Sequence, residues 1–213
     1  MDSNSLFMCI QLTIYRPVYI VSIMFKSNSR ERFIRSTAQL LHERGYSATS
    51  LGDIVAASGS PKGSLYFHFP GGKEELAALA LSHSGNEVCE VIKRAFSSSK
   101  TIEQALKEVF ALFIAGLEQS GFRAGCPVGT VAAEAPDSER VAEAVAATFQ
   151  QWHVILRDRL IQADLRARRA DELAEFILAC FEGGVLLAKA TKATKPLQTA
   201  LKEIIHVLRL ENV

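Results

Sequence analysis

The sequence predicts an all-α fold. Apolar residues recur at helical spacing from residue 29 onward, for example at Val145, Phe149, Trp152 and Leu156. No segment alternates apolar and polar residues for long, and no Asn-Gly or Asp-Gly pair marks a hairpin turn. The pattern therefore predicts helices joined by short turns.

Helix ends can be read from capping residues and from glycine and proline. Gly45 ends the first helix, and Ser50 with Asp53 forms a capping box for the second. Ser60 is expected to cap the third helix, with Pro61 at its first position. The expected helices cover residues 29–44, 51–58, 61–67, 74–97 and 102–119, a short helix from Pro127 to near Pro136, a long helix capped by Asp137, and residues 170–191 and 196–210.

Charge is divided unevenly along the chain. Residues 26–73 carry seven Lys and Arg against three Asp and Glu, whereas residues 74–213 carry sixteen against nineteen. A basic module is typical of phosphate binding. We therefore expect a small basic domain over residues 26–73 and a larger helical domain over residues 74–213.

The basic domain contains a helix-turn-helix pattern between Thr49 and Phe69. Two short helices joined by a three-residue turn with glycine form a unit whose second helix enters the major groove of DNA. Lys62, Tyr66 and His68 would supply donors near phosphate oxygens. The alternative is a compact three-helix module with a solvated face.

Residues 45–54 and 60–76, the latter reading SPKGSLYFHFPGGKEEL, resemble the TetR/AcrR family of bacterial repressors. The resemblance implies binding to double-stranded operator DNA. Phe67 departs from the family pattern, so its contact would be apolar, either with a thymine methyl or only in packing. The implied DNA-contacting residues are Thr49 and Ser50 at phosphate, Ser60, Pro61, Lys62, Gly63 and Ser64 along the reading helix, and Tyr66, Phe67, His68 and Lys73 flanking the backbone.

Residues 125–130 and 132–134 resemble the LmrA/YxaF-like subgroup of that family, which implies a regulator of a multidrug-efflux or detoxification operon. In the resembled fold, helices of the second domain surround an effector cavity. A planar hydrophobic or aromatic effector is therefore expected. The expected cavity residues are Phe110, Phe113, Phe149, Trp152 and Phe176.

Covalent sensing at Cys126 is the competing hypothesis for the effector. Cys126 lies between a Gly-rich loop and a helix start, where the helix dipole would lower the thiol pKa and favour thiolate, with Lys189 as a possible support. The alternative is an inert, partly buried small residue.

The last two helices carry more apolar surface than one monomer needs, and Gly183-Gly184 permits close approach of helices. We therefore expect an isologous four-helix interface in a homodimer. The alternative is burial within one monomer. The expected interface residues are Gly183, Gly184, Leu187, Leu197, Leu201, Ile204, Ile205 and Leu208.

An enzyme is not expected, because the sequence lacks the common nucleotide-binding, hydrolase and metalloprotease motifs. Glu134 and His153 are explained by a polar helix face and a core histidine. The scattered cysteines and histidines predict neither a metal site nor a cofactor. Cysteines so far apart are typical of reduced thiols in the cytoplasm.

Residues 1–25 form an apolar N-terminal extension. Arg16-Pro17 divides it into halves too short to span a bilayer, and Asp2 is its only other charge, unlike a signal peptide. We expect no membrane association, although a membrane-attached sensor is a remote alternative. Met24 lies shortly before the first helix and is an alternative start.

Overall fold

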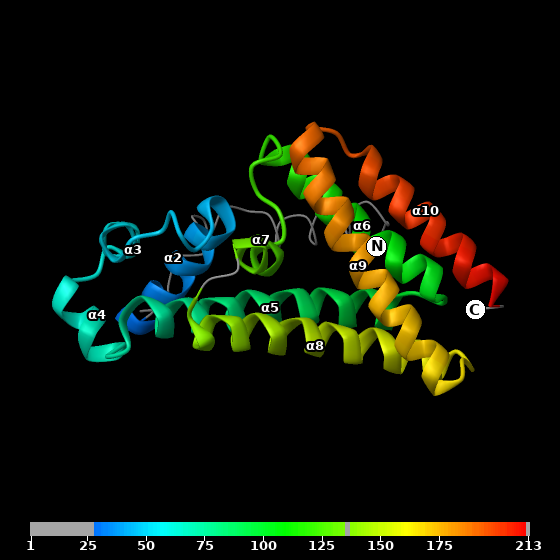
Figure 1. The fold of residues 1–213 in the computed structure, drawn as a ribbon, viewed down its shortest axis with the longest axis horizontal. Helices are drawn as coiled ribbons and strands as arrows, with labels where there is room; N and C mark the ends of the chain where they lie inside the picture. Colours follow the sequence, from blue (N-terminus) through cyan, green and yellow to red (C-terminus); the bar gives the residue numbers. More distant parts are fainter. Residues whose placement is uncertain (1–27, 135–136, 212–213) are drawn as a thin grey trace.

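The computed structural model describes residues 28–134 and 137–211. Every regular element in these ranges is an α-helix, so the predicted fold class is confirmed (Figure 1). None of the described helices is long and apolar enough to cross a membrane. The predictions for residues 1–25 and for Met24 lie outside the described residues.

Three short helices form one end of the molecule: α2 (Ser29–Arg44), α3 (Leu51–Ser58) and α4 (Lys62–His68) (Figure 1). The predicted capping box of α3 is present, because Ser50 and Asp53 exchange side-chain and backbone hydrogen bonds. Gly59 follows α3 with φ 59°, a left-handed conformation that glycine adopts without steric cost. Together α3, the turn and α4 form the predicted helix-turn-helix.

The predicted cap of α4 is wrong. The helix begins at Lys62, Pro61 occupies the N-cap position, and no side chain among the described residues caps the helix. The Ser60 hydroxyl is drawn away from α4, since it accepts a hydrogen bond from Arg32 Nε at 3.1 Å.

A small apolar core holds the three helices together. It consists of Phe33, Leu40, Ile54, Leu65, Phe69 and Leu76. The rings of Phe33 and Phe69 meet edge to face with centroids 6.0 Å apart. Leu76 belongs to the next helix, so this core also anchors the three-helix unit to the rest of the chain.

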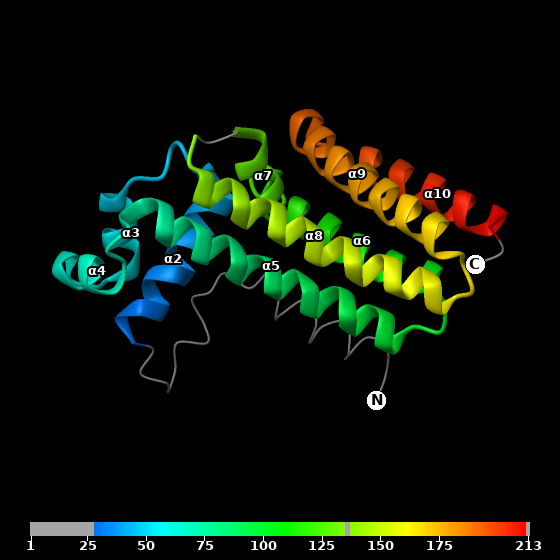
Figure 2. The same ribbon diagram turned by 60° about the horizontal axis from the view of Figure 1, so that its bottom comes forward.

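The remaining helices form the larger part of the molecule. They are α5 (Gly72–Ser98), α6 (Ile102–Gln119), α7 (Pro127–Glu134), α8 (Glu139–Gln162), α9 (Ala167–Thr191) and α10 (Lys195–Leu210). Helices α5 and α8 run side by side along the molecule, while α9 and α10 lie together on its other side (Figure 2). The N-cap of α8 is Ser138, so the expected cap at Asp137 is wrong. Because α5 begins at Gly72, it crosses the predicted domain boundary, and the domain division stays a prediction.

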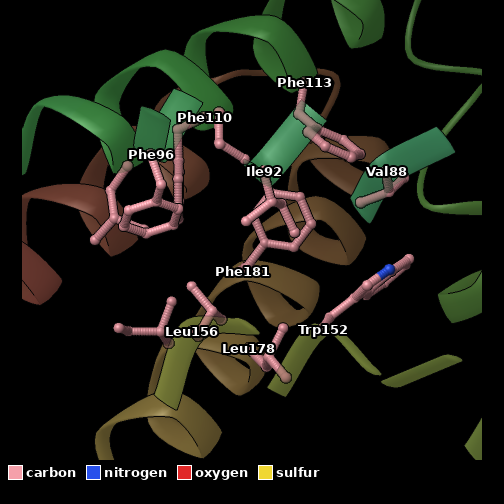
Figure 3. A pocket seen from close by; sticks show the side chains of 12 residues that line it. Val88, Ile92, Phe96, Phe110, Phe113, Trp152, Leu156, Leu178 and Phe181 are labelled. Atoms are coloured by element: carbon pink, nitrogen blue, oxygen red, sulfur yellow. The ribbon is translucent and has the colours of Figure 1, made fainter. Parts of the chain in front are cut away.

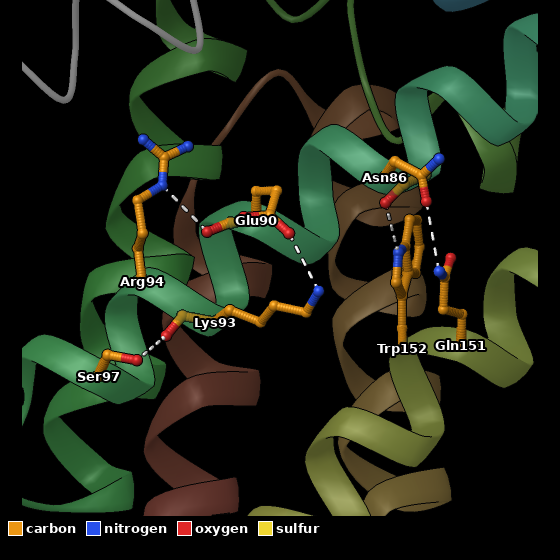
Figure 4. Close-up of polar contacts among 8 residues, drawn as sticks. Asn86, Glu90, Lys93, Arg94, Ser97, Gln151 and Trp152 are labelled. Carbon is orange, nitrogen blue, oxygen red and sulfur yellow. Dashed lines mark hydrogen bonds and ion pairs between the residues drawn. The ribbon is translucent and has the colours of Figure 1, made fainter.

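Close packing of α5 on α8 depends on Gly85. A Cβ at this position would overlap the Thr148 side chain. The Trp152 indole N–H donates to the Gly85 carbonyl at 3.1 Å, and the Gln151 amide donates to Asn86 at 3.3 Å (Figure 4). These contacts fix the indole of α8 against α5.

Gly85→Val should lower the free energy of unfolding by about 1–3 kcal/mol, because the added side chain overpacks the α5–α8 contact. Urea denaturation measures this change. Thr148→Ala in the same variant should recover part of the loss, since it removes the atoms that clash. If the double variant were no more stable than Gly85→Val alone, the clash with Thr148 would not be the cause of the loss.

Candidate nucleic-acid interface and effector cavity

Helix α4 presents an exposed face at the end of the molecule. Lys62, Gly63, Tyr66 and Phe67 are exposed on it, Tyr66 by 50% and Phe67 by 81%. The Phe67 ring meets the neighbouring His68 ring edge to face, with centroids 5.1 Å apart, and most of its surface stays open to solvent. This face therefore presents the Lys62 ammonium, the Tyr66 hydroxyl and the Phe67 ring to solvent, with Gly63, which has no side chain, between them.

Other residues predicted at DNA lie differently. Pro61 and Ser50 are exposed, while Ser64 and His68 are half-buried. Thr49 is buried, and its hydroxyl donates to the Gly45 carbonyl at 2.7 Å.

Ser60 is buried as well. Neither the Thr49 nor the Ser60 side chain is presented to solvent as its implied role requires. Both instead hold the turns on either side of α3.

Lys73 faces the protein. Its Nζ lies 4.1 Å from the centroid of the Tyr46 ring. Burial lowers the pKa of the Lys73 ammonium, and the Glu134 carboxylate nearby offsets part of that effect. The expected phosphate contact would require this side chain to leave Tyr46.

An apolar cavity lies within the larger part of the molecule (Figure 3). Its volume is about 30 Å³, far below the roughly 300–1,000 Å³ of ligand clefts. The space is therefore nearly closed in this conformation. The lining residues are Val88, Ile92, Phe96, Leu106, Val109, Phe110, Phe113, Trp152, Leu156, Ile177, Leu178 and Phe181.

Three predicted effector residues, Phe110, Phe113 and Trp152, line this cavity. Phe149 does not line it and packs edge-on against Trp152, with centroids 5.5 Å apart. Phe176 lies on the outer face of α9 and is 37% exposed, so its predicted place in the cavity is wrong.

The prediction missed Phe96 and Phe181. The Phe181 ring meets Phe110 at 5.2 Å and Phe113 at 4.7 Å, centroid to centroid. Its position four residues after Ile177, on the buried face of α9, is the signal that could have identified it.

The expectation that the helix dipole lowers the pKa of Cys126 is wrong. Cys126 is 1% exposed, and burial together with the neighbouring Glu182 raises the thiol pKa well above its usual value. Cys126 also lies outside the cavity lining, although Lys189 does lie beside the adjacent Gly125. Burial and the raised thiol pKa agree with the alternative of an inert small residue.

Glu182 on α9 was not predicted as a functional residue. Burial raises the pKa of its carboxyl to about 7, while a hydrogen bond from the Cys126 thiol acts in the opposite direction. One carboxyl oxygen of Glu182 is buried without a hydrogen-bond partner among residues 28–134 and 137–211.

Five of the eight predicted dimer residues lie inside the protomer. Gly184, Leu197, Ile204, Ile205 and Leu208 are all buried in the protomer, and Ile205 is the most exposed of them at 8%. A Cβ on Gly184 would lie 3.1 Å from Leu197, so this glycine brings α10 close to α9 of the same chain. For these residues, burial within the monomer is the correct reading.

The outer face of α9 is different. Leu186 and Leu187 are 63% and 55% exposed, and no atom of the described part of the chain lies within 4 Å of a Cβ built on Gly183. Leu201 on α10 is half-buried. These positions are open to a partner.

Two family models match the chain. Residues 33–80 match "Bacterial regulatory proteins, tetR family", and residues 102–203 match "Transcriptional regulator LmrA/YxaF-like, C-terminal domain". The HTH-type transcriptional regulator LmrA of Bacillus subtilis (strain 168) is 33% identical over 179 residues, which cover 82% of this chain and 93% of LmrA. The HTH-type transcriptional repressor DhaR of Mycobacterium sp. (strain GP1) is 29% identical, with 87% of this chain and 94% of DhaR covered.

The fold agrees with these matches. The crystal structure of regulatory protein TetR from Rhodobacter sphaeroides superposes with a TM-score of 0.75 over 84% of this chain and 97% of that chain, at 24% identity. The fold and the matched segments define a helix-turn-helix transcriptional regulator and not an enzyme. The chain belongs to the tetR family of bacterial regulatory proteins, and its C-terminal part is of the LmrA/YxaF-like kind.

Glu182→Gln should flatten the pH dependence of stability. Because the folded state raises the pKa of this acid from 4.5 to about 7, it binds the proton more tightly than the unfolded state does. The stabilisation is therefore complete below pH 4.5 and is lost as pH rises through about 7, by on the order of 3 kcal/mol.

Urea denaturation across this pH range tests the assignment. The glutamine variant should keep its stability as pH rises, whereas Glu175→Gln, a matched change at an exposed site of α9, should behave as wild type. If Glu182→Gln lost as much stability as wild type when the pH rises from 4.5 to above 7, the raised pKa would not belong to Glu182.

Proposed function

We propose that this regulator is a cytoplasmic repressor that binds a palindromic operator as a homodimer and is released by a small hydrophobic or aromatic effector. The observation that carries the proposal is the exposed face of α4, with Lys62, Tyr66 and Phe67 presented at the end of the molecule. Each group suits DNA: a cation for phosphate, a hydroxyl for phosphate or a base edge, and an apolar ring for a thymine methyl.

A stripe on the outer face of α9 supports dimerisation. The exposed apolar or small residues of this stripe are Phe176, Ala179, Leu186, Leu187 and Ala190, with Gly183 open between them. Their spacing of three and four residues places them along one side of the helix. A second copy of α9 packed on this stripe would bury it and bring two α4 helices into one dimer.

The aromatic lining of the cavity supports an apolar effector. Phe110, Phe113 and Phe181 offer edges and faces on which a flat ring can stack. Because the cavity holds only about 30 Å³, an effector must push its helices apart. Binding then favours another arrangement of the dimer and lowers operator affinity by a coupling of about 1–3 kcal/mol. No observation favours the thiol-sensing alternative at Cys126.

Lys62→Ala should weaken binding to duplexes that the wild-type protein selects from a random DNA library. Loss of one phosphate contact should also reduce the slope of log affinity against log salt by about 0.9. Tyr66→Ala should weaken binding with little change in slope, because its hydroxyl is neutral.

Fluorescence anisotropy across a salt series measures both quantities. Lys100→Ala, which removes an exposed lysine far from α4, is the control and should keep the wild-type affinity. Unchanged affinity in both α4 variants would remove α4 as the DNA-reading helix.

Leu187→Glu should convert the protein to a monomer at micromolar concentration, because it places a charge in the centre of the α9 stripe. Ile161→Glu on α8, also an exposed apolar position, should leave the dimer intact. Sedimentation velocity separates the two. A dimer in both variants would place the interface elsewhere.

A further inference from the structure

A carboxylate from the larger part of the molecule holds the turn between α2 and α3. Glu134 is the last residue of α7, and it accepts hydrogen bonds from the backbone N–H groups of Tyr46 at 3.1 Å and Ser47 at 2.7 Å. The helix dipole disfavours an anion at a helix C-terminus. These two charge-assisted hydrogen bonds offset that cost.

The turn is shaped to receive the carboxylate. Gly45 has φ 80°, which favours glycine, and a Cβ on Gly45 would overlap a carboxyl oxygen of Glu134. The Gly45 carbonyl in turn accepts the Thr49 hydroxyl. Thr49 directly precedes Ser50, the N-cap of α3, so the carboxylate fixes the turn from which the helix-turn-helix starts.

The other end of the same segment reaches the cavity wall. Cys126, just before α7, lies close enough to Glu182 on α9 for the thiol and the carboxyl to shift each other's pKa, and Glu182 directly follows Phe181 of the cavity lining. A Cβ on Gly129, in the first turn of α7, would also overlap the Glu182 carboxyl. Helix α7 therefore touches the cavity-lining helix at its start and the α2–α3 turn at its end, and Figure 1 shows it lying between α2 and α9.

We infer that Glu134 is a positioning residue that transmits the state of the cavity to the helix-turn-helix, with α7 as a rigid strut. A shift of α9 as the cavity fills would move α7, and the Glu134 carboxylate would carry that movement to the α2–α3 turn and to α3. This inference rests on the proposed function, since it requires that the helix-turn-helix bind operator DNA.

The single tryptophan of the chain allows a test that needs no effector. Trp152 lines the cavity, so its fluorescence reports the cavity's state. Coupling between two sites is reciprocal, and operator binding must therefore perturb the cavity if the cavity controls operator binding. Wild-type protein saturated with a duplex selected from a random library should show a shifted or quenched Trp152 emission.

Glu134→Gln is nearly isosteric but offers only one acceptor oxygen to the two N–H groups. We expect this variant to bind the same duplex about tenfold more weakly, because the turn before α3 is no longer held in place, and at saturation to show no Trp152 response. Glu134→Asp keeps the charge but withdraws it by one methylene, and should behave in the same way. Glu118→Gln removes an exposed charge near the end of α6 and should match wild type.

The outcomes separate the two claims. A wild-type protein that selects no duplex would refute the proposed function. Operator binding without a Trp152 response in wild type would overturn the inference, and so would a full response and unchanged affinity in Glu134→Gln.

Discussion

One carboxylate that binds two backbone amides ties the DNA-binding unit of this molecule to helix α7. The Glu134 contact with Tyr46 and Ser47 spans from α7 to the turn before α3. Arg140, in the first turn of α8, lies against Gly71, just before α5. The end of α7 and the start of α8 thus both contact the DNA-binding unit, and under the inferred coupling a shift of either helix would reach that unit.

The rest of the architecture suits such a transfer. The small core around Phe33 and Phe69 makes the three short helices one rigid unit. The cavity is nearly closed, and its walls are the long helices α5, α6, α8 and α9. Packed helices rearrange between discrete states and do not deform continuously, so filling the cavity would move whole helices.

The sequence predicted what local chemistry decides. Apolar spacing gave the helices, and the Ser50–Asp53 box and Gly45 gave their ends, because these signals act within four residues. Prediction from the sequence failed where residues far apart in the chain determine the position of a side chain. Ser60 is held by Arg32, which is 28 positions away. Glu134 binds amides 87 and 88 positions earlier, and the apolar face of α10 packs on α9 of the same chain. The periodicity of apolar residues does not identify either partner.

Amide hydrogen exchange at Tyr46 and Ser47 tests the central contact most directly. Ser47 is exposed, so its amide would exchange quickly unless the Glu134 carboxylate binds it. The account predicts that both amides are protected in the full-length protein and exchange much faster in Glu134→Gln, while amides within α2 are unchanged. Equal exchange of Tyr46 and Ser47 in the two proteins would contradict it.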